Sequence, residues 1–142
     1  MPHELPLFAY GTLLSGSLVP EIGRLLRRRV TSLGPARLRG RLHDQGGYPG
    51  LVCAPPGGGW VSGEMLELED PLDTLARLDR YEGFDPARAH AGEYIRVIRR
   101  VESNGVEHAA WVYLLNTDRV RPGPRIAAGD WRRYRQRKAK AG

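Results

Sequence analysis

The residues near the start of the chain that could do chemistry are Tyr10-Gly11-Thr12-Leu13, which follow the apolar run 5–9. A strand that stops at a glycine leaves consecutive backbone N–H groups free to point at one spot. Such a nest binds an anion without a charged side chain. In isolation, the simpler interpretation of a strand that ends in a glycine turn is favoured. The loop therefore indicates an anion site only in combination with a second chemical group.

That second group is Glu82, which lies in Leu78-Asp79-Arg80-Tyr81-Glu82-Gly83 at the end of an expected helix. The helix dipole disfavours a carboxylate at this end by about 0.3–1 kcal/mol at exposed sites, so an acid here is compatible with a functional role. A solvated carboxylate, or one paired with Arg80 or Arg88, explains the residue equally well. The residue types alone leave both interpretations open.

Several common kinds of site have no matching motif in this sequence. There is no phosphate-binding loop of the Gly-x-x-x-x-Gly-Lys type, no dinucleotide-binding glycine pattern and no His-x-x-x-His pair. Ser15 and Ser17 lack the pattern of a nucleophilic serine, and Cys53 in an apolar run is expected to be a small core residue. We expect no metal site and no covalent serine or cysteine mechanism, because the histidines are also scattered, at positions 3, 43, 90 and 108.

The composition is that of an ordinary globular domain. The chain has 142 residues, of which 41% are apolar and 27% charged, enough for one domain with a substantial core. No apolar stretch approaches the roughly 20 residues that span a bilayer, and the first residues lack the features of a signal peptide. With a single cysteine, the sequence predicts a cytoplasmic protein without internal disulfides or a membrane partner.

The net charge of +6 is concentrated at one end of the chain. Residues 119–142 contain nine of the 22 Arg and Lys residues and Asp130 as their only acid, so residues 1–118 are slightly acidic overall. A basic terminal segment is typical of a solvated helix, and no interleaved aromatic residues indicate base stacking. We therefore do not expect a nucleic-acid partner, and divide the chain into a domain at 1–134 and a basic C-terminal tail at 135–142.

Apolar periodicity and turn residues predict the elements. A helix is expected over 18–29, with Ser17 as its cap, and Gly34-Pro35 is expected to break the chain before the next strand. Asn104-Gly105 predicts a tight β-hairpin. Strands are expected at 5–10, 36–44, 51–54, 60–68, 93–102 and 106–115.

A second helix is expected to start at Asp70-Pro71, with the aspartate as a capping carboxylate, and to end at Gly83 in a left-handed cap. Its packing face is predicted to include Leu72, Leu75 and Ala76, with Leu78 and Tyr81 as further candidates. The order of elements lacks a βαβ rhythm. It therefore indicates an α+β domain, a small and mostly antiparallel β-barrel or sheet flanked by two or three helices.

Three segments together resemble the γ-glutamylcyclotransferase-like superfamily, in particular its branch of γ-glutamylamine cyclotransferase and small bacterial relatives. They are Phe8 to Leu13, Leu78 to Gly83 and Tyr94-Ile95-Arg96. Gly47-Tyr48-Pro49, the strand at 60–68, Trp111-Val112-Tyr113 and Gly129-Asp130-Trp131 resemble further elements of this family. The similarity covers roughly residues 5–134, and the order and spacing of these segments make it specific.

The resemblance implies a cofactor-independent enzyme that acts on a small γ-glutamyl substrate. In that family the Tyr-Gly-Thr-Leu loop binds the substrate α-carboxylate through backbone N–H groups, and the motif glutamate is the general acid and base. Carried over, the loop is Tyr10 to Leu13 and the acid is Glu82. The implied reaction is attack of the α-amine on its own γ-carbonyl, which releases 5-oxoproline and an amine.

Other assignments are less direct. Tyr48 and Tyr94 are expected to line the pocket or to pack in the core, and Arg96 to meet a leaving-group carboxylate or to pair with Glu93 or Glu102. Asp130 is expected to cap a helix. The leaving group is expected to be selected by residues 45–50, 84–92 and 117–126.

Two other functions stay open at this point. One is a non-catalytic binding domain of the same fold that holds a small acidic ligand or partner. The other is a different amine-releasing reaction at the same site.

Overall fold

The computed structural model describes residues 4–11, 20–55 and 57–141 of the chain. Two of the expected features, Ser17 as a helix cap and residues 18 and 19 of the helix expected over 18–29, lie outside these residues. The strands are β1 Leu7–Ala9, β2 Val30–Asp44, β3 Pro49–Cys53, β4 Trp60–Leu68, β5 Tyr94–Ser103, β6 Val106–Leu115 and β7 Arg125–Ile126. The helices are α1 Pro20–Arg29, α2 Pro71–Glu82 and α3 Trp131–Ala141, with a short 3-10 helix at Pro86–Arg88.

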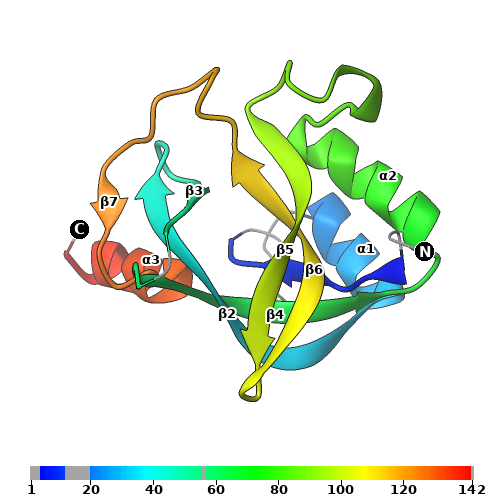
Figure 1. Cartoon of the computed structure of the whole chain (residues 1–142), viewed down its shortest axis with the longest axis horizontal. Helices are drawn as coiled ribbons and strands as arrows, with labels where there is room; N and C mark the ends of the chain where they lie inside the picture. The colour runs from blue at the N-terminus through cyan, green and yellow to red at the C-terminus, as the bar shows by residue number, and fades with distance from the viewer. Residues whose placement is uncertain (1–3, 12–19, 56, 142) are drawn as a thin grey trace.

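Five strands close into a barrel, in the order β2, β4, β1, β6 and β5 (Figure 1). The closing contact joins β5 back to β2 at the pair Arg37 and Glu102, whose side chains form an ion pair of 2.8 Å. All strand pairs are antiparallel except β1 with β6. The extra strands β3 and β7 both pair with β2. The predicted fold class, a mostly antiparallel α+β barrel with three helices, is confirmed.

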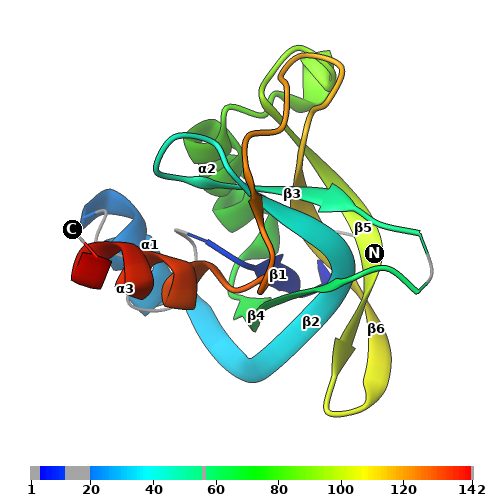
Figure 2. The same ribbon diagram turned by 90° about the vertical axis from the view of Figure 1, so that its left-hand side faces the viewer.

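Strand β2 is longer than expected. It begins directly after α1 and runs through Gly34-Pro35, where the sequence predicted a break. A bulge between Ser32 and Gly34 shifts the register against β4, and Gly34 has a φ of 106° that favours glycine. The Gly-Pro pair therefore bends the strand without ending it, and the bend is visible in Figure 2.

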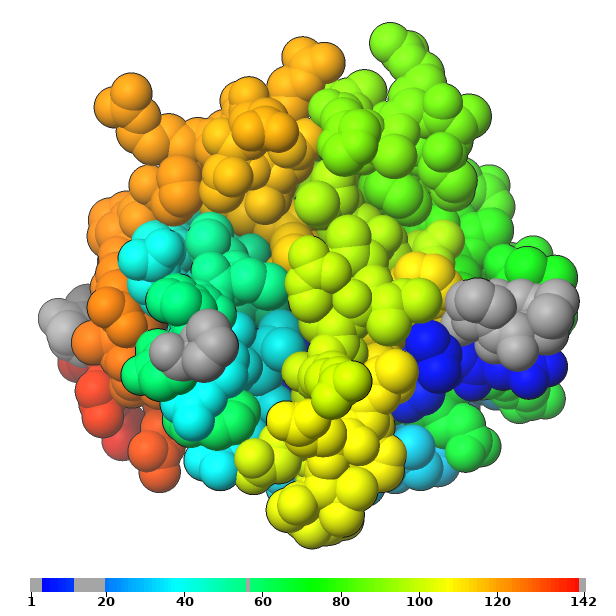
Figure 3. Space-filling view, in the orientation of Figure 1, coloured from blue at the N-terminus to red at the C-terminus, as the bar shows by residue number. Residues whose placement is uncertain are grey.

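The β5–β6 hairpin has the predicted turn. Ser103 pairs with Val106, and the two residues between them, Asn104 and Gly105, have φ values of 53° and 76°. Positive φ at both positions matches the right-handed twist of the strands, which is why Asn-Gly is favoured there. The tip of the hairpin projects at the lower edge of the molecule in Figure 3.

Helix α2 has the predicted ends but a different cap and packing face. It starts at Pro71 and ends before Gly83, whose φ of 71° gives the expected left-handed cap. Asp70 itself has a φ of 47° and makes no side-chain cap; it accepts instead from Arg29 at 3.3 Å. The prediction of a capping carboxylate is therefore wrong.

The buried face of α2 contains Thr74, Leu75, Leu78 and Asp79, whereas Leu72 is 67% exposed and Ala76 is also exposed. The prediction was therefore right for Leu75 and Leu78 and wrong for Leu72, Ala76 and Tyr81, the last of which is 37% exposed. The sequence interpretation followed the apolar residues and overlooked that an aspartate belongs to the inward-facing stripe.

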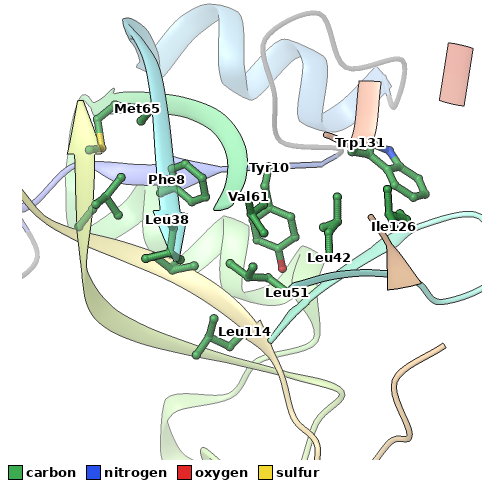
Figure 4. Packing of buried hydrophobic residues seen from close by; sticks show 14 residues of the cluster. Phe8, Tyr10, Leu38, Leu42, Leu51, Val61, Met65, Leu114, Ile126 and Trp131 are labelled. Carbon is green, nitrogen blue, oxygen red and sulfur yellow. The ribbon is translucent and has the colours of Figure 1, made fainter. Parts of the chain in front are cut away.

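Strand β1 separates two clusters of core side chains. Leu7 and Ala9 belong to a cluster with α1 and α2, while Phe8 and Tyr10 belong to one that includes Leu42 and extends to Trp131 of α3 (Figure 4). Successive side chains of a strand point to opposite faces, so the apolar run of β1 is buried on both sides. This burial holds the end of β1, and with it Tyr10 and Gly11, in a fixed position.

Helix α3 begins as expected. The side chain of Asp130 accepts from the backbone N–H of Arg133 at 3.1 Å, and Trp131 is buried. The helix runs past residue 134, across the boundary predicted between domain and tail, and that division stays a prediction. None of the helices in the described part of the chain is long and apolar enough to cross a membrane.

Candidate active site

A cavity of about 350 Å³ opens where the end of β1 meets the end of α2 and the start of β5. Five of the seven residues that the sequence proposed for the site line it. Thr12 and Leu13 lie outside the described residues, so only the first half of the expected loop is placed. The lining residues are Phe8, Ala9, Tyr10, Gly11, Tyr48, Pro49, Tyr81, Glu82, Glu93, Tyr94 and Tyr113.

Glu82, the last residue of α2, contributes a carboxyl group to this cavity. Burial, followed by the nearby charges of Glu93 and Asp79, raises the pKa of this carboxyl to about 7. Among the described residues no cation forms an ion pair with Glu82, so the pairing with Arg80 or Arg88 is not observed. Glu82 is therefore an acid able both to accept and to donate a proton near neutral pH.

Position 11 has no room for a side chain in the described structure. A Cβ at this position would lie 2.3 Å from Cγ of Pro49, the first residue of β3. The backbone of Gly11 can therefore approach the cavity wall only because it has no side chain.

Five of the eleven described residues that line the cavity are tyrosines, and hydrogen bonds fix the hydroxyls of Tyr10, Tyr48, Tyr94 and Tyr113. The hydroxyl of Tyr94 donates to the carbonyl oxygen of Pro49 at 2.5 Å, and that of Tyr10 donates to the carbonyl of Tyr113. Tyr113 donates to Asp79 at 2.7 Å, and Tyr48 to Glu93 at 2.7 Å. Burial raises the pKa of Tyr10, Tyr94 and Tyr113 above the usual value, so these hydroxyls stay protonated. Tyr48 and Tyr94 both line the cavity, and Tyr94 also packs in the core cluster that contains Leu7 and Ala9; their part in substrate binding stays a prediction.

One turn before Glu82, Asp79 forms a buried ion pair that the sequence analysis missed. The Nε and Nη2 atoms of Arg96 donate to its two carboxylate oxygens at 2.7 and 3.0 Å. The guanidinium carbon also lies 4.3 Å from the ring centre of Trp111 and 5.6 Å from that of Phe84. Arg96 therefore does not pair with Glu93 or Glu102, and its side chain is already engaged by protein groups.

A helical pattern in the sequence could have shown that Asp79 points inward. Leu75, Leu78, Asp79 and Glu82 follow the i, i+3, i+4, i+7 pattern of one helix face, which places both acids on the inward side of α2. Of the segments expected to select the leaving group, only 45–50 reaches the cavity, through Tyr48 and Pro49. Residues 84–92 and 117–126 do not line it.

No metal centre is found in the described part of the chain, where no three His, Cys, Asp or Glu side chains are placed to hold an ion. Cys53 is partly buried against the cluster that contains Phe8 and Tyr10.

Comparison with known proteins gives a family match over most of the chain. The model of the family described as "Gamma-glutamyl cyclotransferase, AIG2-like" matches residues 7–133. A search of curated proteins finds no match.

Several solved structures have a similar fold at low sequence identity. YkqA from Bacillus subtilis is 24% identical with a TM-score of 0.71, over 97% of this chain and 43% of that protein, so the chain spans less than half of its length. An uncharacterized protein from Pyrococcus horikoshii is 18% identical with a TM-score of 0.64, over 96% and 97% of the two chains. An AIG2-like protein from Mus musculus is 23% identical with a TM-score of 0.61, over 80% and 78%.

Proposed function

The chain belongs to the gamma-glutamyl cyclotransferase, AIG2-like family, and from this membership we propose that it is a γ-glutamyl cyclotransferase. The α-amine of a γ-glutamyl group attacks its own γ-carbonyl carbon, and the bond from that carbon to the leaving nitrogen breaks. The products are 5-oxoproline and an amine. The observation that carries the proposal is Glu82, an acid with a pKa raised to about 7 at the edge of a substrate-sized cavity.

Proton transfer is the task of Glu82. The substrate α-ammonium is mostly charged at neutral pH and must lose a proton before its nitrogen can attack. A carboxylate whose pKa is raised to about 7 accepts that proton at a lower free-energy cost than an ordinary glutamate would. The lactam nitrogen keeps one of the three ammonium protons. The other two pass to the leaving amine, and Glu82 is placed to relay them.

The α-carboxylate of the substrate needs a partner that is not a basic side chain. No Arg, Lys or His is among the described residues that line the cavity. Backbone N–H groups that begin at Gly11 and continue in Thr12 and Leu13 are the donors we propose for it. The reacting atoms belong to one molecule, so the site has only to hold the folded conformer, and no cofactor takes part in the reaction.

The test is release of 5-oxoproline from a panel of γ-glutamyl amines and peptides. We expect Glu82→Gln to fold normally and to lose roughly 10²- to 10⁴-fold in kcat/KM, the usual contribution of a general acid–base residue. Glu67→Gln, on the exposed side of β4, is the matched control and should keep the wild-type rate. If the wild-type protein releases no 5-oxoproline from any substrate, the alternative of a non-catalytic binding domain is favoured.

A further inference from the structure

The cavity contains a second acid whose charge the proposed reaction leaves unused. Glu93, at the start of β5, lines the same cavity as Glu82 and contributes to its raised pKa. Among the described residues, which include all 22 Arg and Lys of the chain, none forms an ion pair with Glu93. Several other acids of the molecule do have such partners, for example Asp73, Asp79 and Glu102.

Glu93 is held in place from both its side chain and its backbone. Oε1 accepts the hydroxyl of Tyr48 at 2.7 Å, and the backbone carbonyl accepts the N–H of Asn116 at 2.7 Å. Asn116 is 3% exposed, and its side-chain amide also binds the carbonyls of His90 and Gly92 at 3.1 and 2.9 Å. A half-buried acid fixed by this network keeps one direction toward the cavity, unlike an acid at a solvated surface.

The position of Glu93 in the cavity indicates that it faces the leaving amine of the substrate. Tyr48, its hydrogen-bond partner, is 38% exposed, whereas Tyr10 and Tyr94 are buried. Glu93 therefore lies toward the mouth of the cavity, where the amine has to leave. In the proposed function the α-ammonium is matched by Glu82 and the α-carboxylate by the backbone loop, so the carboxylate of Glu93 is left to match a further positive charge.

We infer that Glu93 is a specificity residue that selects γ-glutamyl substrates whose leaving amine carries a second, positively charged group. The inference rests on the proposed function. The substrate class is a γ-glutamyl amide of a diamine or polyamine. Its distal ammonium binds the carboxylate of Glu93 beside the Tyr48 hydroxyl, and a leaving group with a carboxylate is repelled there.

The experiment compares γ-glutamyl amides of three amines of equal chain length: 1,4-diaminobutane, butylamine and 4-aminobutyrate. For the wild-type protein we expect kcat/KM to be highest for the cationic leaving group, at least about tenfold above the neutral one, and lowest for the anionic one. Glu93→Gln should bring the ratio of cationic to neutral substrate to about one. The ratio cancels any effect that the substitution has on all substrates alike.

Two further variants complete the test. Tyr48→Phe removes only the hydroxyl that orients Glu93 and should reduce the same ratio partly, while Glu67→Gln should leave it unchanged. An unchanged ratio in Glu93→Gln, or a wild-type preference for the neutral or anionic substrate, would overturn the inference.

Failure of the proposed function is detected separately. If no amide is turned over, we expect the Glu82→Gln protein still to bind the diaminobutane amide about tenfold more tightly than the butylamine amide in calorimetry. The Glu82→Gln, Glu93→Gln double variant should lose this difference. Equal dissociation constants in the single variant would reject the role of Glu93 independently of catalysis.

Discussion

Asp79 and Glu82 lie one helical turn apart on the same inward face of α2, yet they differ in their partners. Asp79 accepts two hydrogen bonds from Arg96 and one from Tyr113. Glu82 has no cationic partner in the described structure, and its pKa is raised to about 7. Asp79 is buried and Glu82 half-buried, and the main difference between the structural acid and the proposed catalytic one is the counter-charge.

The two acids also affect folding in opposite ways. A buried pair with good geometry is tolerated as long as both partners are present. An unpaired buried carboxylate has a cost, because ionising it in the folded state is harder than in the unfolded chain. The two positions should therefore respond differently to substitution and to pH.

The largest change in stability is expected when Asp79 loses its partner. Arg96→Met should destabilise the protein by about 3–5 kcal/mol, because it leaves the charge of Asp79 buried without compensation. Denaturant unfolding measures the change. Arg99→Met, an exposed arginine on the same strand, is the matched control and should stay within about 0.5 kcal/mol of the wild type. A loss below about 1 kcal/mol for Arg96→Met would contradict the comparison.

Substitution of the unpaired acid, Glu82, should have the opposite effect and stabilise the folded protein. Because the folded pKa of Glu82 lies above the unfolded value of 4.5, the ionised form costs stability that develops between pH 4.5 and 7 and is fully present above pH 7. At pH 8, Glu82→Gln should therefore stabilise the protein, by up to about 3 kcal/mol. The gain should vanish as the pH falls towards 4. Unfolding at pH 8 and pH 4.5, with Glu67→Gln as control, measures it. An equal effect at both values would mean that Glu82 is not desolvated.

A smaller effect is expected in the pH dependence of catalysis. The value of kcat/KM should fall about tenfold per pH unit below about pH 7, where the free enzyme holds Glu82 protonated. Glu93→Gln removes one of the charges that raise this pKa and should move the acidic limb to lower pH. Burial, the first cause of the shift, remains. Profiles that coincide for the two proteins would show that the two carboxylates do not interact.

The smallest effect is expected from the end of α3. Deletion of residues 135–142 should leave kcat/KM unchanged, because the described part of this segment, 135–141, does not line the cavity and Tyr134, which donates to Asp44, is retained. A steady-state assay on the shortened chain checks this. A large loss of activity would instead give the basic helix a part in closing the site.

The sequence predicted those features that depend on local backbone chemistry. Asn104-Gly105 and Gly83 require positive φ, which few residues adopt, so the hairpin and the end of α2 could be recognised without knowledge of the fold. The position of Glu82 followed directly from the end of that helix. Its role in catalysis stays a proposal.

Features that depend on distant partners were not predictable in the same way. Asp79 finds Arg96 on β5, and a local pattern does not reveal such a partner. Likewise, Gly34-Pro35 is usually a chain breaker, but pairing with β4 carries the strand through it as a bulge. The steric need for Gly11 became visible only once Pro49 was placed against it.

The closing pair of the barrel, Arg37 with Glu102, has a consequence for the kinetics of folding. The walls of the cavity come from segments near residues 10, 48, 82, 93 and 113, which meet only when strands distant in sequence are joined. Contacts of such long sequence separation form slowly, whereas the β5–β6 hairpin is local and can form early. In a refolding experiment, far-ultraviolet circular dichroism should therefore recover first, and ligand binding should return only with the slowest phase.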